Sequence, residues 1–238
     1  EATLSRTFHK AVKYGGNPVM QPTAGVEQGD GMPAAVPKSG GVWWDPAFGI
    51  YRMRYDAGWL HKYAYATSKD GIAWERHGIL SGNGPGKALP DFVSNSSAAF
   101  IDFDEPDPAR RFKLFIRQPD FAEPERVNGF GNGGIQAYVM FSADGMNWSA
   151  SVPTSPVGDR STVFYNPFRK KWAYSIRAYT FDPFARVRHY RECDDLIGRP
   201  LWREDEQVFW TRADRLDSVD PAINEPPQLY NLDAVGYE

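Results

Sequence analysis

The sequence predicts an all-β protein of the β-propeller class, built from four-stranded antiparallel blades, because one pattern occurs three times. In each copy an apolar run ends at a turn residue, which is Asp45, Asp102 and Asn166 in the three copies. An aromatic-rich run follows each turn, for example Tyr-Arg-Met-Arg-Tyr at 51–55. The turn residues are spaced by about 57 and 64 residues, an interval typical of a four-stranded blade with long loops. We therefore expect about three to three and a half blades.

Composition limits the function classes. The 238 residues are 42% hydrophobic and 15% aromatic, which is enough for a sizeable core, and 22 Gly and 19 Pro suit many turns between short strands. The net charge is −3 and no lysine-arginine run occurs, so we expect no nucleic-acid partner. No apolar stretch approaches about 18 residues, so we expect no membrane segment. A single cysteine, Cys193, excludes an internal disulfide.

Cofactor chemistry has no support in the sequence. The four histidines show no metal-ligand spacing, so a zinc site is not expected, and nothing indicates calcium in the channel. We predict no metal and no other cofactor. One lone thiol is compatible with several compartments, among which we favour the periplasm or secretion.

The domain organisation follows from the repeat. We predict a single propeller domain over 1–238, with blades at about 39–80, 95–153 and 159–211 and a fourth inner strand that starts near 230. A propeller has at least about four complete blades around its channel, so this one is expected to be incomplete. Either the chain is a piece of a longer polypeptide, or a second chain supplies the rest, or the closing blades were lost. We favour a longer polypeptide with a missing C-terminal segment.

The turns within each blade are legible in the sequence. Asp45–Gly49 and Asn166–Lys170 contain proline and suit the turn between strands one and two. The phrase Ser-x-Asp-Gly-x-x-Trp occurs at 68–74 and 142–148 and suits the turn between strands three and four. There Asp and Gly make the tight reversal and the Trp packs between blades. We interpret these phrases as structural.

Antiparallel order then separates two faces of the disc. The turns from strand one to two and from three to four share one face, so the other loops share the opposite face. That second face carries long, polar, aromatic-rich loops, where binding usually occurs. These are the loops at 56–62, 118–134 and 178–187 and the interblade segments at 79–94, 151–158 and 207–231.

Polar side chains are predicted to converge on the mouth of the central channel at this face. Counting back from the turn residues gives Lys38, Asn95 and Asp159 at the starts of the inner strands. The ends of the second strands add Arg117 and Arg177, with Asp56 and the neighbours Ser39, Ser96 and Arg160. Among these residues, the adjacent pair Asp159 and Arg160 is the strongest indication of a functional site. The alternative is that these two residues only cap a strand with a salt bridge.

Three segments carry a resemblance to a known family. Gly158–Trp172, Asp107–Lys113 and Tyr230–Val235 resemble bacterial proteins described as similar to the glycoside hydrolase family 32 N-terminal domain. The Ser-x-Asp-Gly-x-x-Trp phrases are similar to those of the five-bladed propeller glycosidases, which include families 32, 43, 62, 68, 117 and 130. The resemblance covers most of the chain from about residue 17 and implies a five-bladed propeller, with one to two blades missing here.

The resemblance also implies an activity, the hydrolysis of glycosidic bonds in an oligo- or polysaccharide substrate. It implies carboxylates from different blades that meet in an axial funnel. Glycosidic cleavage requires one carboxylic acid to protonate the leaving oxygen, while a second carboxylate acts as nucleophile or as base for water. The sequence lacks the Asn-Asp-Pro-Asn-Gly and Arg-Asp-Pro motifs of true family 32 members. Glu192-Cys193 matches the invertase-type acid motif, but its register places it on an outer strand, so we interpret the match as coincidence.

Site roles are therefore assigned from position in the repeat. The catalytic candidates are Asp159, then Asp233, then Glu225 as an acid, although its setting also suits an exposed turn; Asp30 and Asp91 are weaker alternatives. Arginine forks suit sugar hydroxyls and planar anions, and loop aromatics can stack on sugar faces. The substrate-binding candidates are Arg160, Asn95, Arg117, Arg177, Trp59 and Tyr230, with Phe121 and Phe181 as further aromatic candidates.

Two other function classes stay open. A propeller scaffold hosts many functions, so a non-catalytic carbohydrate-binding or interaction module is one alternative. A polysaccharide lyase is another, with Tyr230 or His189 as base and Arg188 neutralising a uronate. Hydrolysis requires two carboxylates about 5–10 Å apart that face one cavity, whereas a lyase requires one base with arginines.

Overall fold

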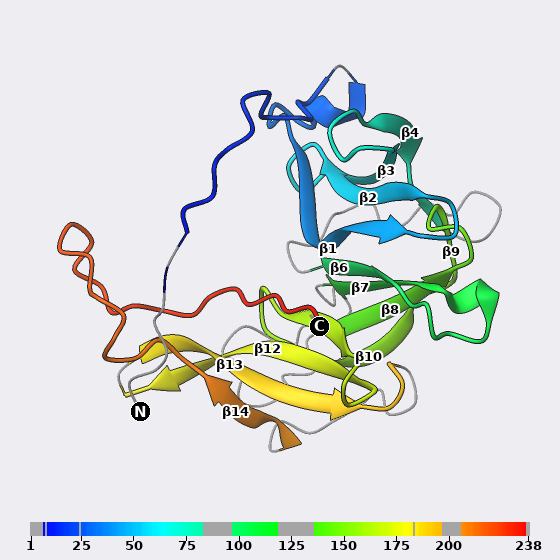
Figure 1. Cartoon of the computed structure of the whole chain (residues 1–238). Helices are drawn as coiled ribbons and strands as arrows, with labels where there is room; N and C mark the ends of the chain where they lie inside the picture. Colours follow the sequence, from blue (N-terminus) through cyan, green and yellow to red (C-terminus); the bar gives the residue numbers. More distant parts are fainter. Residues whose placement is uncertain are drawn as a thin grey trace.

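The chain is an all-β protein assembled from four-stranded antiparallel blades, which confirms the predicted fold class (Figure 1). The computed structural model describes residues 7, 9–23, 25–82, 97–118, 136–182, 184–196 and 206–236. Within these ranges no helix is long and apolar enough to cross a membrane.

Each blade is a meander in which consecutive strands pair. Blade one consists of β1 (Ala35–Asp45), β2 (Ile50–Ala57), β3 (Lys62–Ser68) and β4 (Glu75–Ile79). Blade two consists of β6 (Ser97–Ile101), β7 (Phe112–Gln118), β8 (Gln136–Ser142) and β10 (Val152–Pro156), with the short 3-10 helix η2 (Pro108–Arg110) before β7. Blade three consists of β11 (Thr162–Asn166), β12 (Lys171–Phe181), β13 (Phe184–Cys193) and β14 (Val208–Thr211).

The repeated Ser-x-Asp-Gly phrases form the same turn in blades one and two. In blade one Asp70 Oδ1 accepts hydrogen bonds from the amides of Ile72 and Ala73, both 2.8 Å long, and Ser68 Oγ accepts one from the amide of Gly71. Asp144 Oδ1 accepts the equivalent bonds in blade two. The glycine that follows each aspartate has a positive φ, 73° at Gly71, a backbone conformation that glycine adopts without a Cβ clash. The phrases are therefore turn elements, as expected.

Blades one and two are joined by backbone pairing as well as by side chains. Their inner strands β1 and β6 pair in parallel at Ser39 and Ala98, so the two blades form one eight-stranded sheet. A second parallel pair joins β5 (Ser81–Gly82) to β9 (Asn147–Trp148). In the described part of the chain blade three is a separate sheet.

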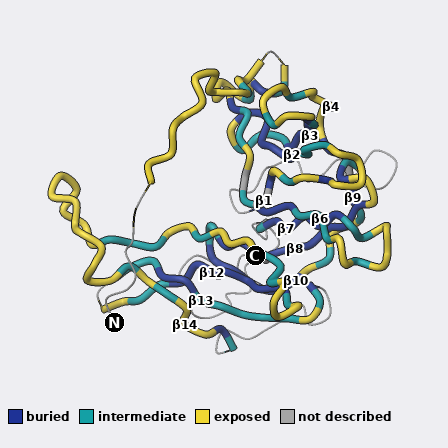
Figure 2. The backbone as a smooth tube through the Cα atoms, in the orientation of Figure 1, coloured by how far each residue is buried: buried dark blue, intermediate teal, exposed yellow. Residues whose placement is uncertain are grey.

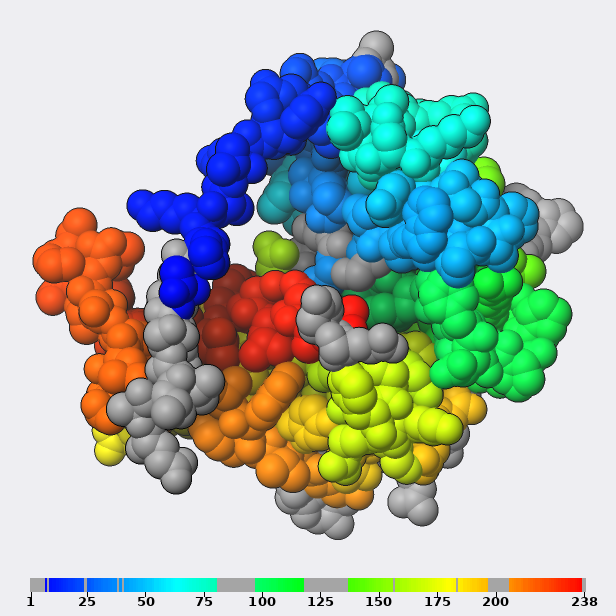
Figure 3. Space-filling view, viewed as in Figure 1, coloured from blue at the N-terminus to red at the C-terminus, as the bar shows by residue number. Residues whose placement is uncertain are grey.

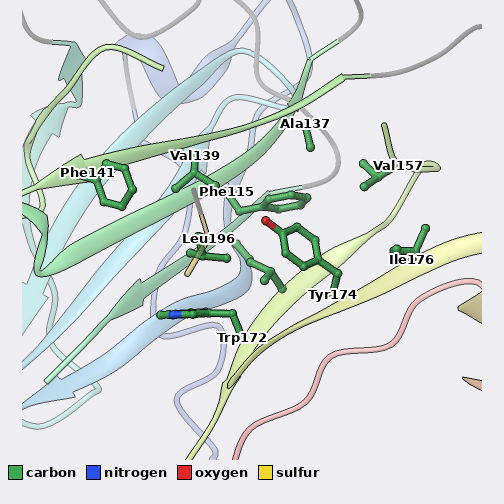
Figure 4. Packing of buried hydrophobic residues seen from close by; sticks show 11 residues of the cluster. Phe115, Ala137, Val139, Phe141, Val157, Trp172, Tyr174, Ile176 and Leu196 are labelled. Atoms are coloured by element: carbon green, nitrogen blue, oxygen red, sulfur yellow. The ribbon is translucent and has the colours of Figure 1, made fainter. Parts of the chain in front are cut away.

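Aromatic cores fill the spaces between blades. Trp148 is fully buried between blades one and two with Phe112 and Leu114. Between blades two and three Phe115 meets Tyr174 edge to face, with ring centroids 5.9 Å apart (Figure 4). The middle strands are the buried ones, whereas the outermost strands β4 and β14 are mainly exposed (Figure 2).

Residues 230–236 differ from the expected fourth inner strand. They run alongside β11 in the same direction, since Thr162 Oγ1 donates to the Leu232 carbonyl at 2.8 Å and Gly236 lies against Pro167. Parallel inner strands are also seen in β1 and β6. However, 230–236 contain no strand, because a strand requires backbone pairing and the described contact uses a side-chain hydroxyl. This segment is red in Figures 1 and 3 and lies between blades one and three.

The outer face of blade one is covered by the 3-10 helix η1 (Gly25–Gln28), which is held by one buried carboxylate. Glu27 accepts hydrogen bonds from the Tyr55 hydroxyl, from Arg76 Nε and from the Thr23 amide, each 2.7 Å long. Burial alone would raise the pKa of Glu27, but these bonds together lower it to about 2.

We expect Glu27→Gln to destabilise the fold by about 3 kcal/mol at pH 7, since the folded pKa lies far below the ordinary value of 4.5. The contribution of an ionised Glu27 is fully present above pH 4.5 and is lost as the pH falls toward 2. The difference between wild type and variant should therefore shrink in urea titrations at pH 3. Glu75→Gln, an exposed position on the same blade, is the matched control. An equal loss at pH 7 and pH 3 would contradict the assignment.

Candidate functional site

The candidate site is centred on Asp159, in the link between β10 and β11. Antiparallel order places this link on the same face as the β2–β3 and β12–β13 turns. The link is fixed to blade three by a close backbone approach. Ser161 Oγ donates to the Gly158 carbonyl at 2.7 Å and accepts from the Arg177 amide at 3.0 Å. A Cβ on Gly158 would lie closer than 3.0 Å to the Arg177 carbonyl, so only glycine fits here.

The Asp159 carboxylate is bound by two other parts of the chain. Arg117, at the end of β7, places Nη1 3.5 Å from Oδ1, and the Tyr230 hydroxyl donates to Oδ2. The Arg160 amide also donates to Oδ1 at 2.9 Å. The side chains of Arg117 and Asp159 are 15% and 18% exposed, so the pair is accessible at one edge. Arg160 has a φ of 56°, a strained conformation for a side chain of its size.

Three further arginines lie around this carboxylate and Tyr230. Arg177 Nε donates to the Asp159 carbonyl at 3.1 Å. Arg188, its cross-strand partner on β13, is fully buried and donates to the carbonyls of Arg160 and Tyr230, each at 3.1 Å. Arg186 lies 4.8 Å from the centre of the Tyr230 ring, as a cation–π contact.

The electrostatics of the site follow from burial and from this crowding of charge. Burial lowers the pKa of Arg117, and Arg177 lowers it further, while Asp159 opposes both effects. Burial lowers the pKa of Arg188 to about 10. Burial and the hydrogen bond to Asp159 both raise the pKa of Tyr230, so its hydroxyl is protonated at neutral pH and acts as a donor.

The other two catalytic candidates lie apart from Asp159. Asp233 is exposed and accepts a hydrogen bond from Asn231 Nδ2 at 2.9 Å. It lines a different cavity, described below. Glu225 is exposed in the loop after β14, and among the described contacts none joins it to the Asp159 cluster.

The structure brings Arg117, Arg160, Arg177 and Tyr230 of the substrate-binding candidates together around Asp159. Trp59 lies on the β2–β3 turn, is 40% exposed, and its amide donates to the Met32 carbonyl, which belongs to the covering segment of blade one. Asn95, Asp91 and Phe121 lie outside the described residues.

The structure also shows the surroundings of three weaker candidates, Phe181, Asp30 and Asp56. Phe181 is exposed at the β12–β13 turn and contacts Phe184, with ring centroids 6.2 Å apart. Asp30 is exposed near His61, 3.9 Å from its ring nitrogen. Asp56 is fully buried 3.6 Å from Arg54, so its side chain does not reach the surface at the mouth.

Glu192 does not have the properties of an acid catalyst. Burial alone would raise its pKa, but hydrogen bonds from Tyr190 and Arg169 lower it, whereas a general acid needs a raised pKa. It pairs with Ala173, four residues along β12 from Arg177. The match to the invertase-type motif is therefore local, as interpreted from the sequence.

An aromatic cavity of about 730 Å³ lies along the inner strands of the three blades. Asp233 lines it, together with the turn after β6, so it extends toward the face opposite Asp159. Its aromatic walls are Trp43, Trp44, Phe100, Phe103, Phe164, Tyr165 and Trp172. None of the residues bound to Asp159 lines this cavity.

Arg186 is the member of the cluster that the sequence argument missed. The pairing of β12 with β13 sets Arg188 opposite Arg177 and Arg186 opposite Tyr179, so all four share one sheet face. The alternating Arg186-Val187-Arg188 could have indicated this, had the hairpin register been known. In the part of the chain that the structure describes, no cluster of three or more His, Cys, Asp or Glu side chains could hold a metal ion.

When this chain is compared with known proteins, only solved structures are similar to it. No family model matches the sequence, and no curated protein matches it. A family 117 glycoside hydrolase from the marine bacterium Zobellia galactanivorans is 14% identical, with a TM-score of 0.47 over 75% of this chain and 57% of that one. A β-fructofuranosidase from Schwanniomyces occidentalis, complexed with fructosyl-erythritol, is 16% identical, with a TM-score of 0.46 over 74% of this chain and 35% of that one.

An N-acetylgalactosamine deacetylase from F. plautii, in complex with blood group B trisaccharide, is 15% identical. Its TM-score is 0.45, over 70% of this chain and 50% of that one. The chain thus spans between 35% and 57% of the length of these three proteins. Two family 43 glycoside hydrolases are also among the similar structures. The blade architecture is established by the strand pairing described above.

Proposed function

We propose that the chain forms part of a glycoside hydrolase that acts on an oligo- or polysaccharide, with Asp159 as a catalytic carboxylate. The observation that supports this most is the setting of Asp159. It is a partly exposed carboxylate on the loop face, bound by Arg117 of blade two and by Tyr230 of the C-terminal segment. A guanidinium and a hydroxyl donor both favour the ionised form of a carboxylate. An ionised carboxylate is what a glycosidase uses as nucleophile or as base for water.

The reaction also needs a general acid that protonates the leaving glycosidic oxygen, while water supplies the hydroxyl group of the new reducing end. We propose Asp233 ahead of Glu225 for this role, although its side chain lines the aromatic cavity and not the mouth around Asp159. Asp233 belongs to the same short segment as Tyr230, and its charge interacts with Arg188 of the cluster. Glu225 is on the exposed loop that precedes this segment.

Substrate binding in this proposal uses the groups around Asp159. Arg117 and Arg160 would bind sugar hydroxyls or an acidic substituent, and the half-exposed ring of Tyr230 would contact the sugar. Arg177 was also a binding candidate, but it is 3% exposed, so its role in this proposal is to hold the Asp159 carbonyl in place. Trp59, on the β2–β3 turn, and Asn95, which lies outside the described residues, are further proposed contributors.

The test is a survey of aryl glycosides and oligosaccharides with the purified chain, followed by two matched variants. Cleavage of any glycoside supports the proposal. Asp233→Asn should then lower kcat by about 10²–10⁴-fold, as expected for loss of a general acid, and Glu225→Gln should leave it within about twofold. The reverse order would transfer the acid role to Glu225. Absence of cleavage by the full-length protein that contains this chain, when it is folded, would refute the hydrolase.

One observation favours a second candidate, a carbohydrate-binding module without hydrolytic activity. The described residues around Asp159 include five arginines and one carboxylate in contact with them, whereas hydrolysis requires two carboxylates facing one cavity. Saturable oligosaccharide binding without any release of product would establish this second function.

A further inference from the structure

Among the residues that the structure describes, the mouth around Asp159 gathers five arginines against one carboxylate, which is hydrogen-bonded to two of them. Arg117 forms an ion pair with Asp159. By contrast, the hydrogen bonds that Arg177, Arg186 and Arg188 donate in the described part of the chain all go to neutral acceptors, and the only carboxylate that raises the pKa of Arg188 there is the exposed Asp233. Arg177 Nε donates to a carbonyl at 3.1 Å, Arg186 Nη1 donates to Gln228 Oε1 at 2.6 Å, and Arg188 donates to carbonyls and to a hydroxyl.

These guanidinium groups cannot separate to relieve their repulsion. Arg188 is fully buried and fixed by Ser175 Oγ, 3.0 Å from Nε, and by the Ser175 carbonyl, 2.6 Å from Nη2. Arg177 is 3% exposed and its guanidinium lies 4.3 Å from the centre of the Tyr179 ring. Arg177 lowers the pKa of both Arg117 and Arg188, which is the signature of like charges held close together.

The fixed positive charge lies behind an accessible surface. Tyr230 is 39% exposed, and two guanidinium groups approach its ring, that of Arg186 at 4.8 Å and that of Arg160 at 6.0 Å from the centroid. Both arginines are partly exposed, unlike Arg177 and Arg188. A ligand over Tyr230 would therefore meet two planar forks in front of a buried cationic layer. Such forks match the oxygens of a carboxylate or a sulfate.

We propose that the saccharide bound at this mouth is acidic, with a carboxylate or sulfate group seated against Arg160 and Arg186 beside Tyr230. The inference rests on the proposed function in one respect, that the mouth around Asp159 is the sugar site. The net charge of the whole chain is −3, so the positive mouth is a local feature and not a general attraction for anions. An anion there replaces repulsion among the arginines with ion pairs.

The experiment measures binding by titration calorimetry and uses matched pairs of probes. Oligogalacturonate, oligoglucuronate and oligomannuronate are each compared with their neutral methyl esters, and a sulfated galactan oligosaccharide is compared with its desulfated form. We expect the acidic member of at least one pair to bind about tenfold tighter at low salt, with the preference falling at higher salt. Which pair shows the preference distinguishes carboxylate from sulfate.

Arg186→Gln and Arg160→Gln should each reduce this preference several-fold, and together they should abolish it. Arg169→Gln removes an arginine from the opposite end of the same blade, where it pairs with Glu192 and is 64% exposed, and it should change nothing. The inference is overturned by equal binding of acidic and neutral probes, by no binding of any probe, or by a preference that survives in the double variant.

Binding and turnover separate this inference from the proposed function. Tight binding of an acidic probe by the full-length protein that contains this chain, without any cleavage, would refute the hydrolase and leave the acidic ligand in place. Cleavage of neutral glycosides with no preference for charge would refute the acidic ligand and leave the hydrolase.

Discussion

Asp159→Asn should reduce kcat by about 10³-fold or more on any glycoside that the chain cleaves, while KM changes little. The amide has almost the same shape as the carboxylate, so the contacts to Tyr230 and to the Arg160 amide can persist. What is lost is the negative charge, which a nucleophile or base requires. Steady-state kinetics on the best substrate of the survey measures the effect.

Two further variants serve as controls for the effect of Asp159→Asn on kcat. Asp182→Asn removes a carboxylate from the exposed β12–β13 turn on the same face, and kcat should be unchanged. Tyr230→Phe removes one donor to Asp159 and keeps the ring, so a smaller loss of about tenfold is expected. Equal activity of Asp159→Asn and wild type, with both folded, would exclude Asp159 from catalysis.

Gly158→Ala should destabilise the chain by about 3 kcal/mol, the upper range for overpacking at a tight site. The added methyl group would collide with the Arg177 carbonyl, a backbone atom in the interior strand β12 that has little freedom to move. Either β12 or the link that carries Asp159 must shift, so activity should fall together with stability. Urea unfolding measures the first effect and kinetics the second.

The control is Gly15→Ala, where a Cβ meets nothing within 4 Å, and stability should stay within about 0.5 kcal/mol of wild type. A loss at position 158 no larger than at position 15 would mean that the close approach of the link to β12 is not a constraint in solution.

The blades could be predicted because their signals are local. A turn aspartate that binds the amides two and three residues ahead, with glycine next to it, dictates the same reversal wherever it occurs, as at Asp70 and Asp144. The regular spacing of these turns predicts consecutive antiparallel strands within each blade. That strand order in turn predicts the face on which Asp159 lies.

The set of residues that make up the site was harder to predict from the sequence. Arg186 joins the cluster because ten residue pairs match β12 to β13, and this register depends on a hairpin turn that the sequence did not reveal. The fourth strand was expected from the apolar residues near Ala234 and Val235, but apolar character alone does not provide a pairing partner. Asp233 was expected at the mouth from its position in the repeat, whereas in the structure it lines the aromatic cavity.

The parallel pairs between blades one and two have a mechanical consequence for blade three. Hydrogen-bonded backbone pairs resist sliding of blade one against blade two. In the described structure blade three contacts blade two through packed side chains. The ion pair between Arg117 on β7 and Asp159 ahead of β11 crosses the boundary between blades two and three. The ion pair is thus a contact that ties β7 to the link ahead of β11, at the place where the proposed substrate would bind.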